Sequence, residues 1–278
     1  MANKAGTTLL LITLILFSST SSASDREKVY KIGVVPQFET KKLHKIWQPI
    51  LQQLEDLTGL KFKLQGAATI PSFEKELLNG QFDFAYVNPF HLLIANESQG
   101  YLPIVRDHSK KLQGILVTRK DGNIQKLKDL NHKTLAFPSP NALGASLQMR
   151  AELTDKFNLN FTPKYVNTHD SVYLNVLLNQ AVAGGGVRKT FNKQPKQIRQ
   201  ALKIIYKTTP VAPHPVVVHP TVKKEISDKV RKAFIKLAKS IKGKTLLAKI
   251  PIRNPGNAFL EDYQSLNKMN LKRFYKSK

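Results

Sequence analysis

Polar residues stand at three points of the sequence where an apolar strand pattern gives way to a helical pattern. Asn88 follows the run FDFAYV, Ser139 follows TLAF and a proline, and the pair His169-Asp170 follows KYVNT. Side chains of these types cap helices, and the first N–H groups of a helix have no acceptor within the helix itself. These N–H groups also carry the positive end of the helix dipole, so such turns bind anions. Together the three turns predict a site for a small, polar or anionic ligand.

A strand before each turn and a helix after it are needed to hold these residues in place. The segments Gln81–Asn96, Leu127–Leu153 and Pro163–Asn179 each show a short apolar run followed by apolar residues at helical spacing. Serine before proline predicts a helix that opens at Ser139, and Asn167 is the predicted cap of the third helix. Open α/β sheets bind their ligands at the carboxyl edge of the strands, which is where these turns are expected.

The order of the patterns divides the chain into two α/β lobes. Strand and helix patterns alternate from Val29 to Asn96, and a second alternating series begins after Gly122. Such alternation is typical of sheets covered by helices. Two β-rich stretches, near Gln113–Arg119 and Ile204–Val218, are the expected crossings between the lobes. We expect a signal segment at 1–23, a first lobe formed by 24–112 and 213–278, and a second lobe formed by 113–212.

The first residues have the pattern of a secretory signal. Lys4 is followed by the apolar run Leu9–Phe17 and then by Ser21-Ser22-Ala23, which predicts cleavage after Ala23. The apolar run is too short to cross a bilayer as a helix. The chain has no cysteine, which excludes disulfides, thiolate metal sites and a lipid-bearing cysteine. We therefore expect a free protein in the periplasm of a Gram-negative bacterium.

The chain is strongly basic. Its 44 lysines and arginines against 19 acidic residues give a formal net charge of +25. One interpretation is attraction for an anionic solute or an anionic envelope surface, and the other is a lysine-rich but ordinary solvated surface. The second interpretation fits most of the charge, because the lysines are scattered along the whole chain. No nucleic-acid-binding motif is present, so we expect no nucleic-acid partner.

Catalytic motifs are absent from the sequence. It contains no Gly-x-Ser-x-Gly elbow, no His-Glu-x-x-His and no phosphate-binding P-loop. The histidines are scattered without the spacing of metal ligands. We expect neither an enzyme nor a cofactor or metal site.

Several motifs, in this order, resemble one known family, the periplasmic phosphate/phosphite/phosphonate-binding proteins of ABC importers. They are KIGVVPQ, FDFAYVNPFHLLIA, LKDLNHKTLAFPSPNALGAS, THDSVYLNVLLNQAVAGGG and TPVAPHPVVVHP, and they cover nearly all of the expected mature chain. The resemblance implies a two-lobed type II binding protein, in which each lobe is a mixed sheet flanked by helices and two hinge strands join the lobes. It also implies capture of a small anionic solute for a permease in the inner membrane. We expect a monomer.

The resemblance also implies binding residues. Tyr86 and Asn88 stand at the family's Asp-x-Ala-Tyr-x-Asn-Pro segment, and the His-Asp pair is kept as His169-Asp170. The family's hydroxyl-rich turn, Ser-Thr-Ser-Gly, aligns with Asn141-Ala142-Leu143-Gly144, so the glycine is kept and the three hydroxyls are lost. The backbone N–H groups of this turn and the Asn141 side chain are the expected donors. An acidic residue that meets an amino group on the ligand aligns with Val182, so an aminophosphonate is not the expected ligand.

Alternatives stay open for several residues and for the function. Tyr86 is either a ligand contact or a core residue, and His169 either donates to an oxyanion, more strongly when protonated, or caps a helix in water. Gly184–Gly186 either let the backbone approach a ligand or form a flexible exit from a strand. The same fold could serve as a sensor that docks on a membrane histidine kinase, or as a basic protein that adheres to the envelope.

Overall fold

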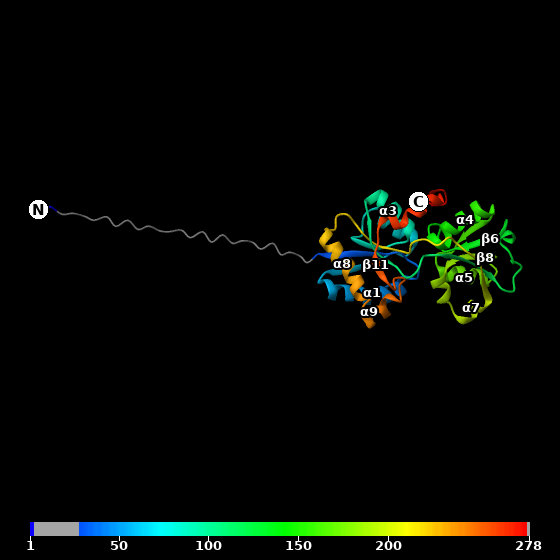
Figure 1. The fold of residues 1–278 in the computed structure, drawn as a ribbon, viewed down its shortest axis with the longest axis horizontal. Coiled ribbons are helices and arrows are strands. Elements are labelled where there is room, and N and C mark those ends of the chain that lie inside the picture. Colours follow the sequence, from blue (N-terminus) through cyan, green and yellow to red (C-terminus); the bar gives the residue numbers. More distant parts are fainter. Residues whose placement is uncertain (3–27, 277–278) are drawn as a thin grey trace.

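Two lobes lie side by side, and each is built around one sheet (Figure 1). The computed structural model describes residues 1–2 and 28–276, so nearly all of the predicted signal segment lies outside the described residues. Among the residues that are described, no helix combines the length and the apolar character needed to cross a membrane.

The sheet of the first lobe is mixed, with strand order β11-β4-β10-β3-β1-β2. β1 pairs in parallel with β2 and β3, whereas β10 pairs antiparallel with β3 and β4, and β11 pairs antiparallel with β4. The return of the chain after the second lobe therefore inserts β10 into the middle of the first sheet. The strands are β1 (Val29–Val34), β2 (Lys61–Gly66), β3 (Phe84–Tyr86), β4 (Leu102–Asp107), β10 (Val216–Val218) and β11 (Pro255–Asn257).

The sheet of the second lobe is also mixed, with strand order β7-β6-β8-β5-β9. β6 pairs in parallel with β7 and β8, and β5 pairs antiparallel with β8 and β9. The strands are β5 (Gly114–Arg119), β6 (Thr134–Phe137), β7 (Thr162–Tyr165), β8 (Ala183–Val187) and β9 (Leu202–Lys207).

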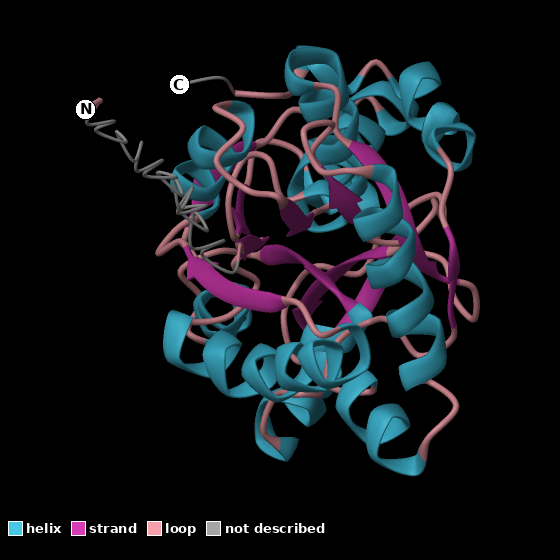
Figure 2. Ribbon diagram, turned by 90° about the vertical axis from the view of Figure 1, so that its left-hand side faces the viewer, coloured by secondary structure: helices cyan, strands magenta, loops and turns pink. Residues whose placement is uncertain are grey.

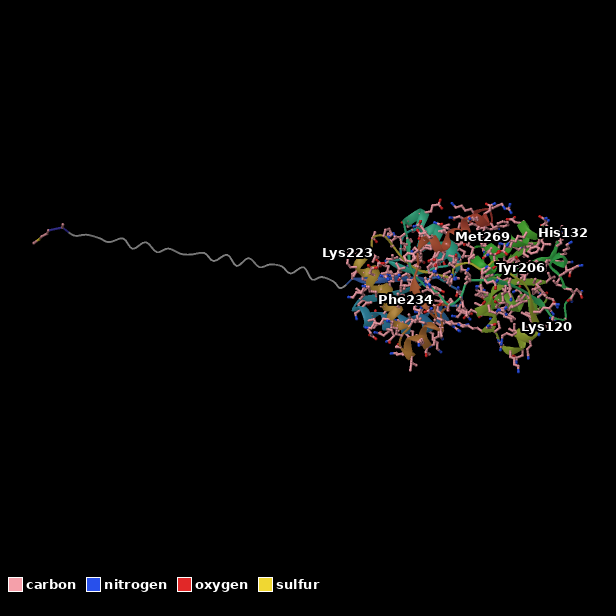
Figure 3. The ribbon with its side chains drawn as sticks, viewed as in Figure 1. Lys120, His132, Tyr206, Lys223, Phe234 and Met269 are labelled. Carbon is pink, nitrogen blue, oxygen red and sulfur yellow. The ribbon has the colours of Figure 1, made fainter. Side chains whose placement is uncertain are left out.

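Helices cover the sheets of both lobes (Figure 2). In α1, Leu43, Ile46, Ile50 and Leu54 recur at helical spacing and are buried, as the sequence pattern predicts. Figure 3 places Phe234 of α8 within the first lobe and Tyr206 of β9 within the second. The first lobe carries α1 (Thr40–Thr58), α2 (Ile70–Leu78), α3 (Pro89–Gln99), α8 (Lys224–Leu237), α9 (Ile241–Leu247) and the 3-10 helices η3 (Leu260–Met269) and η4 (Leu271–Arg273). The second carries η1 (Leu127–Leu130), the π-helical turn η2 (Leu143–Leu147), α4 (Gln148–Phe157), α5 (His169–Leu177), α6 (Arg188–Asn192) and α7 (Lys196–Ala201).

Two segments cross between the lobes, from β4 to β5 and from β9 to β10. They pair with each other at Leu112 and Val211, whose N–H groups donate to each other's carbonyl oxygens at 2.8 and 2.9 Å. The prediction of two mixed α/β lobes joined by two hinge strands is confirmed. The first sheet draws its strands from 29–107 and 216–257, and the second from 114–207. The lobe limits 24–112, 213–278 and 113–212 stay a prediction.

Three details of the predicted turns and helices are wrong. Helical structure after β6 begins at Leu143 and not at Ser139, because Ser139 to Ala142 form a loop that precedes the wide π turn. The cap of α5 is Thr168, whose hydroxyl accepts from the N–H of Ser171, while Asn167 adopts a left-handed conformation with φ 69°. The apolar spacing of FLEDYQSLNKMNLKRFY predicts one terminal amphipathic helix, but the segment forms two 3-10 helices, because the left-handed Asn270 interrupts it.

Gly184–Gly186 form the middle of β8, a central strand, and are not a flexible exit. Helix α5 and η2 pack directly on this strand. A methyl group at Gly184 would lie 2.5 Å from a Val172 methyl, and one at Gly185 would overlap the carbonyl oxygen of Ala145. The absence of side chains here therefore brings both helix N-termini close to the sheet.

Candidate ligand-binding site

The ends of strands from both lobes meet at one small cavity of about 20 Å³. The first lobe contributes residues after β1 and β3, and the second contributes the start of η2 and of α5. Five residues expected from the sequence lie together in its wall, namely Asn88, Ala142, Leu143, Gly144 and His169. The remaining lining residues are Val35, Gln37, Ile70, Ala145, Val187 and His214.

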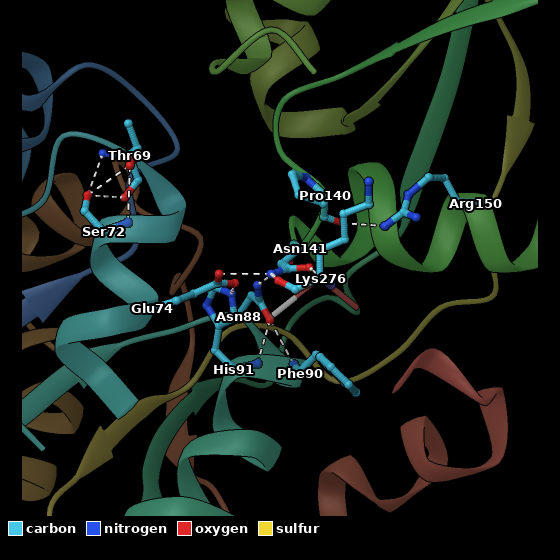
Figure 4. Close-up of polar contacts among 10 residues, drawn as sticks. All are labelled: Thr69, Ser72, Glu74, Asn88, Phe90, His91, Pro140, Asn141, Arg150 and Lys276. Carbon is cyan, nitrogen blue, oxygen red and sulfur yellow. Dashed lines mark hydrogen bonds and ion pairs between the residues drawn. The ribbon is translucent and has the colours of Figure 1, made fainter. Parts of the chain in front are cut away.

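Asn88 caps α3, as the Asn-Pro pattern predicts. Its side-chain oxygen accepts from the N–H groups of Phe90 and His91, both at 2.9 Å. Its amide nitrogen donates to the carbonyl oxygen of Asn141 in the other lobe at 3.1 Å (Figure 4). The amide of Asn88 therefore joins the two lobes as well as capping the helix.

Asn141 does not line the cavity, because its side chain is paired with protein groups (Figure 4). Its amide nitrogen donates to a carboxylate oxygen of Glu74 and to the carbonyl oxygen of Lys276, both at 2.9 Å. Its side-chain oxygen accepts from the N–H of Lys276 at 3.0 Å. Glu74 in turn contacts His91 Nε2 at 2.7 Å. A ligand contact from this amide requires one of these bonds to break.

The backbone of η2 supplies the free donors of the cavity. The N–H groups of Leu143, Gly144 and Ala145 belong to its first turn, which leaves them without an acceptor inside the helix. Within the described part of the chain they make no hydrogen bond to another segment. η2 continues into α4 as far as Phe157, so the positive end of a long helical run faces the cavity.

Two buried imidazoles face the cavity. Burial lowers the pKa of His169 to about 4 and that of His214 to about 3. Both rings are therefore neutral near pH 7, and burial opposes the protonated state in which His169 would donate more strongly. His169 Nδ1 lies 3.4 Å from the Thr190 hydroxyl, and His214 Nε2 lies 3.0 Å from the amide nitrogen of Gln37. Each ring nitrogen that carries a proton can donate one hydrogen bond to an oxyanion.

Tyr86 lies in a second small cavity, of about 10 Å³, that shares Val35 and Gln37 with the first. Its ring packs 5.1 Å from Trp47 and stacks 5.5 Å from His214. Its hydroxyl is buried without a hydrogen-bond partner among the described residues. Burial raises the pKa of this hydroxyl well above its usual value, so it stays protonated and can act as a donor.

The structure places the last two expected residues outside both cavities. Ser139 is buried, and its hydroxyl has no partner within the described residues. Asp170 is half-exposed, accepts from the Gln194 amide at 2.7 Å and pairs with Lys42 of the other lobe at 3.7 Å. Asp170 therefore lies at the edge of the junction, where it pairs with the other lobe instead of lining a cavity.

Sequence reasoning missed three residues at the junction, Gln37, His214 and Lys189. Gln37 follows the first strand in the VVPQ motif, and His214 lies in the proline-rich return segment, so both stand in motifs that carry the family resemblance. Lys189 follows the glycine strand β8 and has no local signal. Only the approach of the two lobes brings it to the cavity beside Tyr86.

The lining of the first cavity is better suited to an anion than to a cation. Backbone N–H groups, neutral imidazoles and amides line the first cavity, and no carboxylate does. No group of three or more histidines and acids in the described chain is placed to bind a metal ion.

A sequence profile described as "ABC transporter, phosphonate, periplasmic substrate-binding protein" matches residues 32–263. The chain belongs to this family. The predictions of the family, and of a solute-binding protein instead of an enzyme, are therefore confirmed. The family is one of periplasmic binding proteins, whereas the signal segment and the source organism stay predictions.

Relatives agree with this membership. The phosphonates-binding periplasmic protein of Escherichia coli is 23% identical over 265 residues, which cover 90% of this chain and 78% of the relative. Two solved structures share the fold, each with a TM-score of 0.80. One is a binding protein component of an ABC phosphonate transporter from Pseudomonas aeruginosa, 17% identical, covering 89% of this chain and 88% of that one. The other is PhnD1 from Prochlorococcus marinus in complex with methylphosphonate, 15% identical, covering 89% and 98%.

Proposed function

We propose that the protein captures a phosphonate, or a related tetrahedral oxyanion, between its lobes and delivers it to an ABC permease. The observation that carries this proposal is the cavity at the junction, into which the first turn of η2 and His169 both face without any lining carboxylate. The names of the relatives support the same ligand class, since one is a phosphonates-binding protein and another was solved with methylphosphonate.

The loss of the hydroxyl turn changes how the head group is held. Three side-chain donors are replaced by Asn141, Ala142 and Leu143, and the Asn141 amide is paired with Glu74 and Lys276. Three backbone N–H groups and two imidazoles take over as donors in this proposal. A charge-assisted hydrogen bond is stronger than a neutral one, so a small number of donors suffices for a dianion.

The lobes must separate for this ligand to enter. A cavity of about 20 Å³ has room for roughly one water molecule, which is less than a phosphonate needs. The contacts Asn88–Asn141 and Lys42–Asp170 join the lobes directly, so the structure is a closed arrangement. Closure around a ligand by a hinge at Leu112 and Val211 is the motion expected of this fold.

The test is calorimetric titration of the purified protein with methylphosphonate, phosphate, phosphite and sulfate. We expect saturable binding of at least one phosphorus oxyanion. His169→Ala should weaken it at least tenfold, because one buried donor is lost, which corresponds to about 1.4 kcal/mol. The matched control is His44→Ala, on the exposed face of α1. Absence of binding for every anion would overturn the proposal. The alternative of a sensor component that signals to a membrane histidine kinase stays a prediction.

A further inference from the structure

Lys189 reaches from the second lobe into the wall of the cavity that contains Tyr86. Its ammonium group makes no ion pair within the described part of the chain. It donates a hydrogen bond of 3.4 Å to the carbonyl oxygen of Ala248 in the first lobe. A partly buried ammonium without a carboxylate is costly, so the site favours an anion at this position.

The charges around Lys189 are mostly positive. Burial, together with the charges of Lys193 and Arg253, lowers the pKa of Lys189 to about 7. Asp107, the acid whose charge acts on Lys189, is already paired, because it accepts from the backbone N–H groups of Arg253 and Asn254 and from the Ser109 hydroxyl. Lys249 also lines the cavity. An anion next to Lys189 would offset its burial, whereas an ammonium group would be repelled.

This cavity adjoins the cavity proposed for the oxyanion. Gln37 and Val35 line both of them, and the Tyr86 ring of the second cavity stacks 5.5 Å from the His214 ring of the first. Tyr86 also presents a buried hydroxyl that has no partner among the described residues. A ligand held at η2 can therefore extend past Gln37 toward one cation and one unpaired donor.

We propose that the protein selects phosphonates whose carbon substituent bears a second anionic group, which Lys189 and the Tyr86 hydroxyl bind. The inference rests on the proposed function and names the ligand class within it. A carboxylate suits the position, because it accepts from an ammonium and from a hydroxyl at the same time.

Three phosphonates with two carbons test the proposal by calorimetric titration of the purified protein. They are phosphonoacetate with an anionic tail, ethylphosphonate with an apolar tail and 2-aminoethylphosphonate with a cationic tail. We expect phosphonoacetate to bind at least tenfold more tightly than ethylphosphonate, and 2-aminoethylphosphonate to bind most weakly. Equal affinity for phosphonoacetate and ethylphosphonate would overturn the inference and leave the proposed function standing. If none of the three binds, and phosphate does not bind either, the proposed function itself fails.

Variants of Lys189 separate ligand recognition from a contact that merely joins the lobes. Lys189→Gln should remove the preference for phosphonoacetate while it changes the affinity for ethylphosphonate less than threefold. Lys189→Glu should reverse the order and favour 2-aminoethylphosphonate. Lys196→Gln, on the exposed start of α7, makes the same change of net charge away from the site and should leave the order intact. Equal weakening of all three ligands by Lys189→Gln would assign Lys189 a structural role and refute the inference.

Discussion

At the scale of single residues, the ability of the site to bind a ligand depends on which polar groups are already paired with protein groups. Asn88 and Asn141 stand at the junction, yet their amides bond to protein groups of the opposite lobe or of the C-terminal segment. The backbone N–H groups of η2 and the ring of His169 remain available. Because a group that is already bonded gains little from a ligand, the unpaired donors decide the affinity.

The two buried imidazoles predict that the protein loses stability below neutral pH. Their pKa values of about 4 for His169 and about 3 for His214 lie below the unfolded value near 6.5, so the unfolded chain binds more protons. The stability that the two neutral rings contribute is complete above pH 6.5, and it is lost as the pH falls toward their pKa values in the folded protein. At pH 5 each costs about 2 kcal/mol of unfolding free energy.

Urea denaturation at pH 7 and pH 5 measures this loss. His214→Gln keeps an acceptor for the Gln37 amide but cannot be protonated. Its free energy of unfolding should therefore differ between pH 7 and pH 5 by about 2 kcal/mol less than that of the wild type. His44→Gln, on the exposed face of α1, is the matched control. An unchanged pH dependence in His214→Gln would contradict the burial argument.

Local sequence signals predicted only part of these residue roles. The cap at Asn88 follows from an asparagine before a proline, and the structure shows it. Ser139 precedes Pro140 in the same way but caps nothing, because the loop continues to Ala142 before the wide turn. Lys189 could not be found, since its position is defined by contact between lobes that are distant in sequence.

At the scale of elements, the glycine strand β8 controls how closely η2 approaches the sheet. A methyl group at Gly185 would overlap the Ala145 carbonyl oxygen and lie 2.7 Å from the Phe137 ring. Because this oxygen belongs to the backbone of η2, the overlap can be relieved only if η2 moves as a whole. The glycines of β8 therefore hold the donor turn in position.

Gly185→Ala should lower the free energy of unfolding by about 1–3 kcal/mol through overpacking. It should also weaken oxyanion binding, because the N–H groups of Leu143, Gly144 and Ala145 move with η2. Gly122→Ala is the matched control, since a methyl group there meets only Arg119, at 3.3 Å and beyond. Chemical denaturation and titration with methylphosphonate provide the two measurements. A stable variant with unaltered affinity would show that η2 can shift without cost.

The type and order of the elements were readable from the sequence more reliably than their packing. Alternating strand and helix patterns predicted the two α/β lobes, because burial of one helix face leaves a clear period, whereas the mixed sheets were implied only by the family resemblance. AVAGGGV carries no such period, since glycines have no side chain to alternate, so the sequence left open whether Gly184–Gly186 belong to the strand or to a flexible exit from it. The 3-10 helices at the C-terminus keep apolar residues at a similar spacing, so periodicity alone did not distinguish them from an α-helix.

At the scale of the whole molecule, the closed junction predicts that ligand entry requires the lobes to part. The ion pair Lys42–Asp170 spans the lobes at 3.7 Å, whereas Lys224–Asp228 is a comparable pair within α8. Because the chain has no cysteine, paired cysteines at these positions would be its only thiols. A short bismaleimide can therefore cross-link cysteines at positions 42 and 170 and lock the lobes together. In the control, it cross-links cysteines at positions 224 and 228 within α8 and leaves the lobes free.

The order of addition decides the outcome of this experiment. The variant Lys42→Cys/Asp170→Cys, cross-linked before methylphosphonate is added, should lose binding, because the closed cavity of about 20 Å³ cannot admit the ligand. Cross-linked after the ligand is added, it should retain the ligand through dialysis. Lys224→Cys/Asp228→Cys and the uncross-linked variant should bind and release normally in both orders. Free exchange of ligand in the locked protein would mean that the ligand passes through the closed junction, and a hinge motion would then be unnecessary for binding.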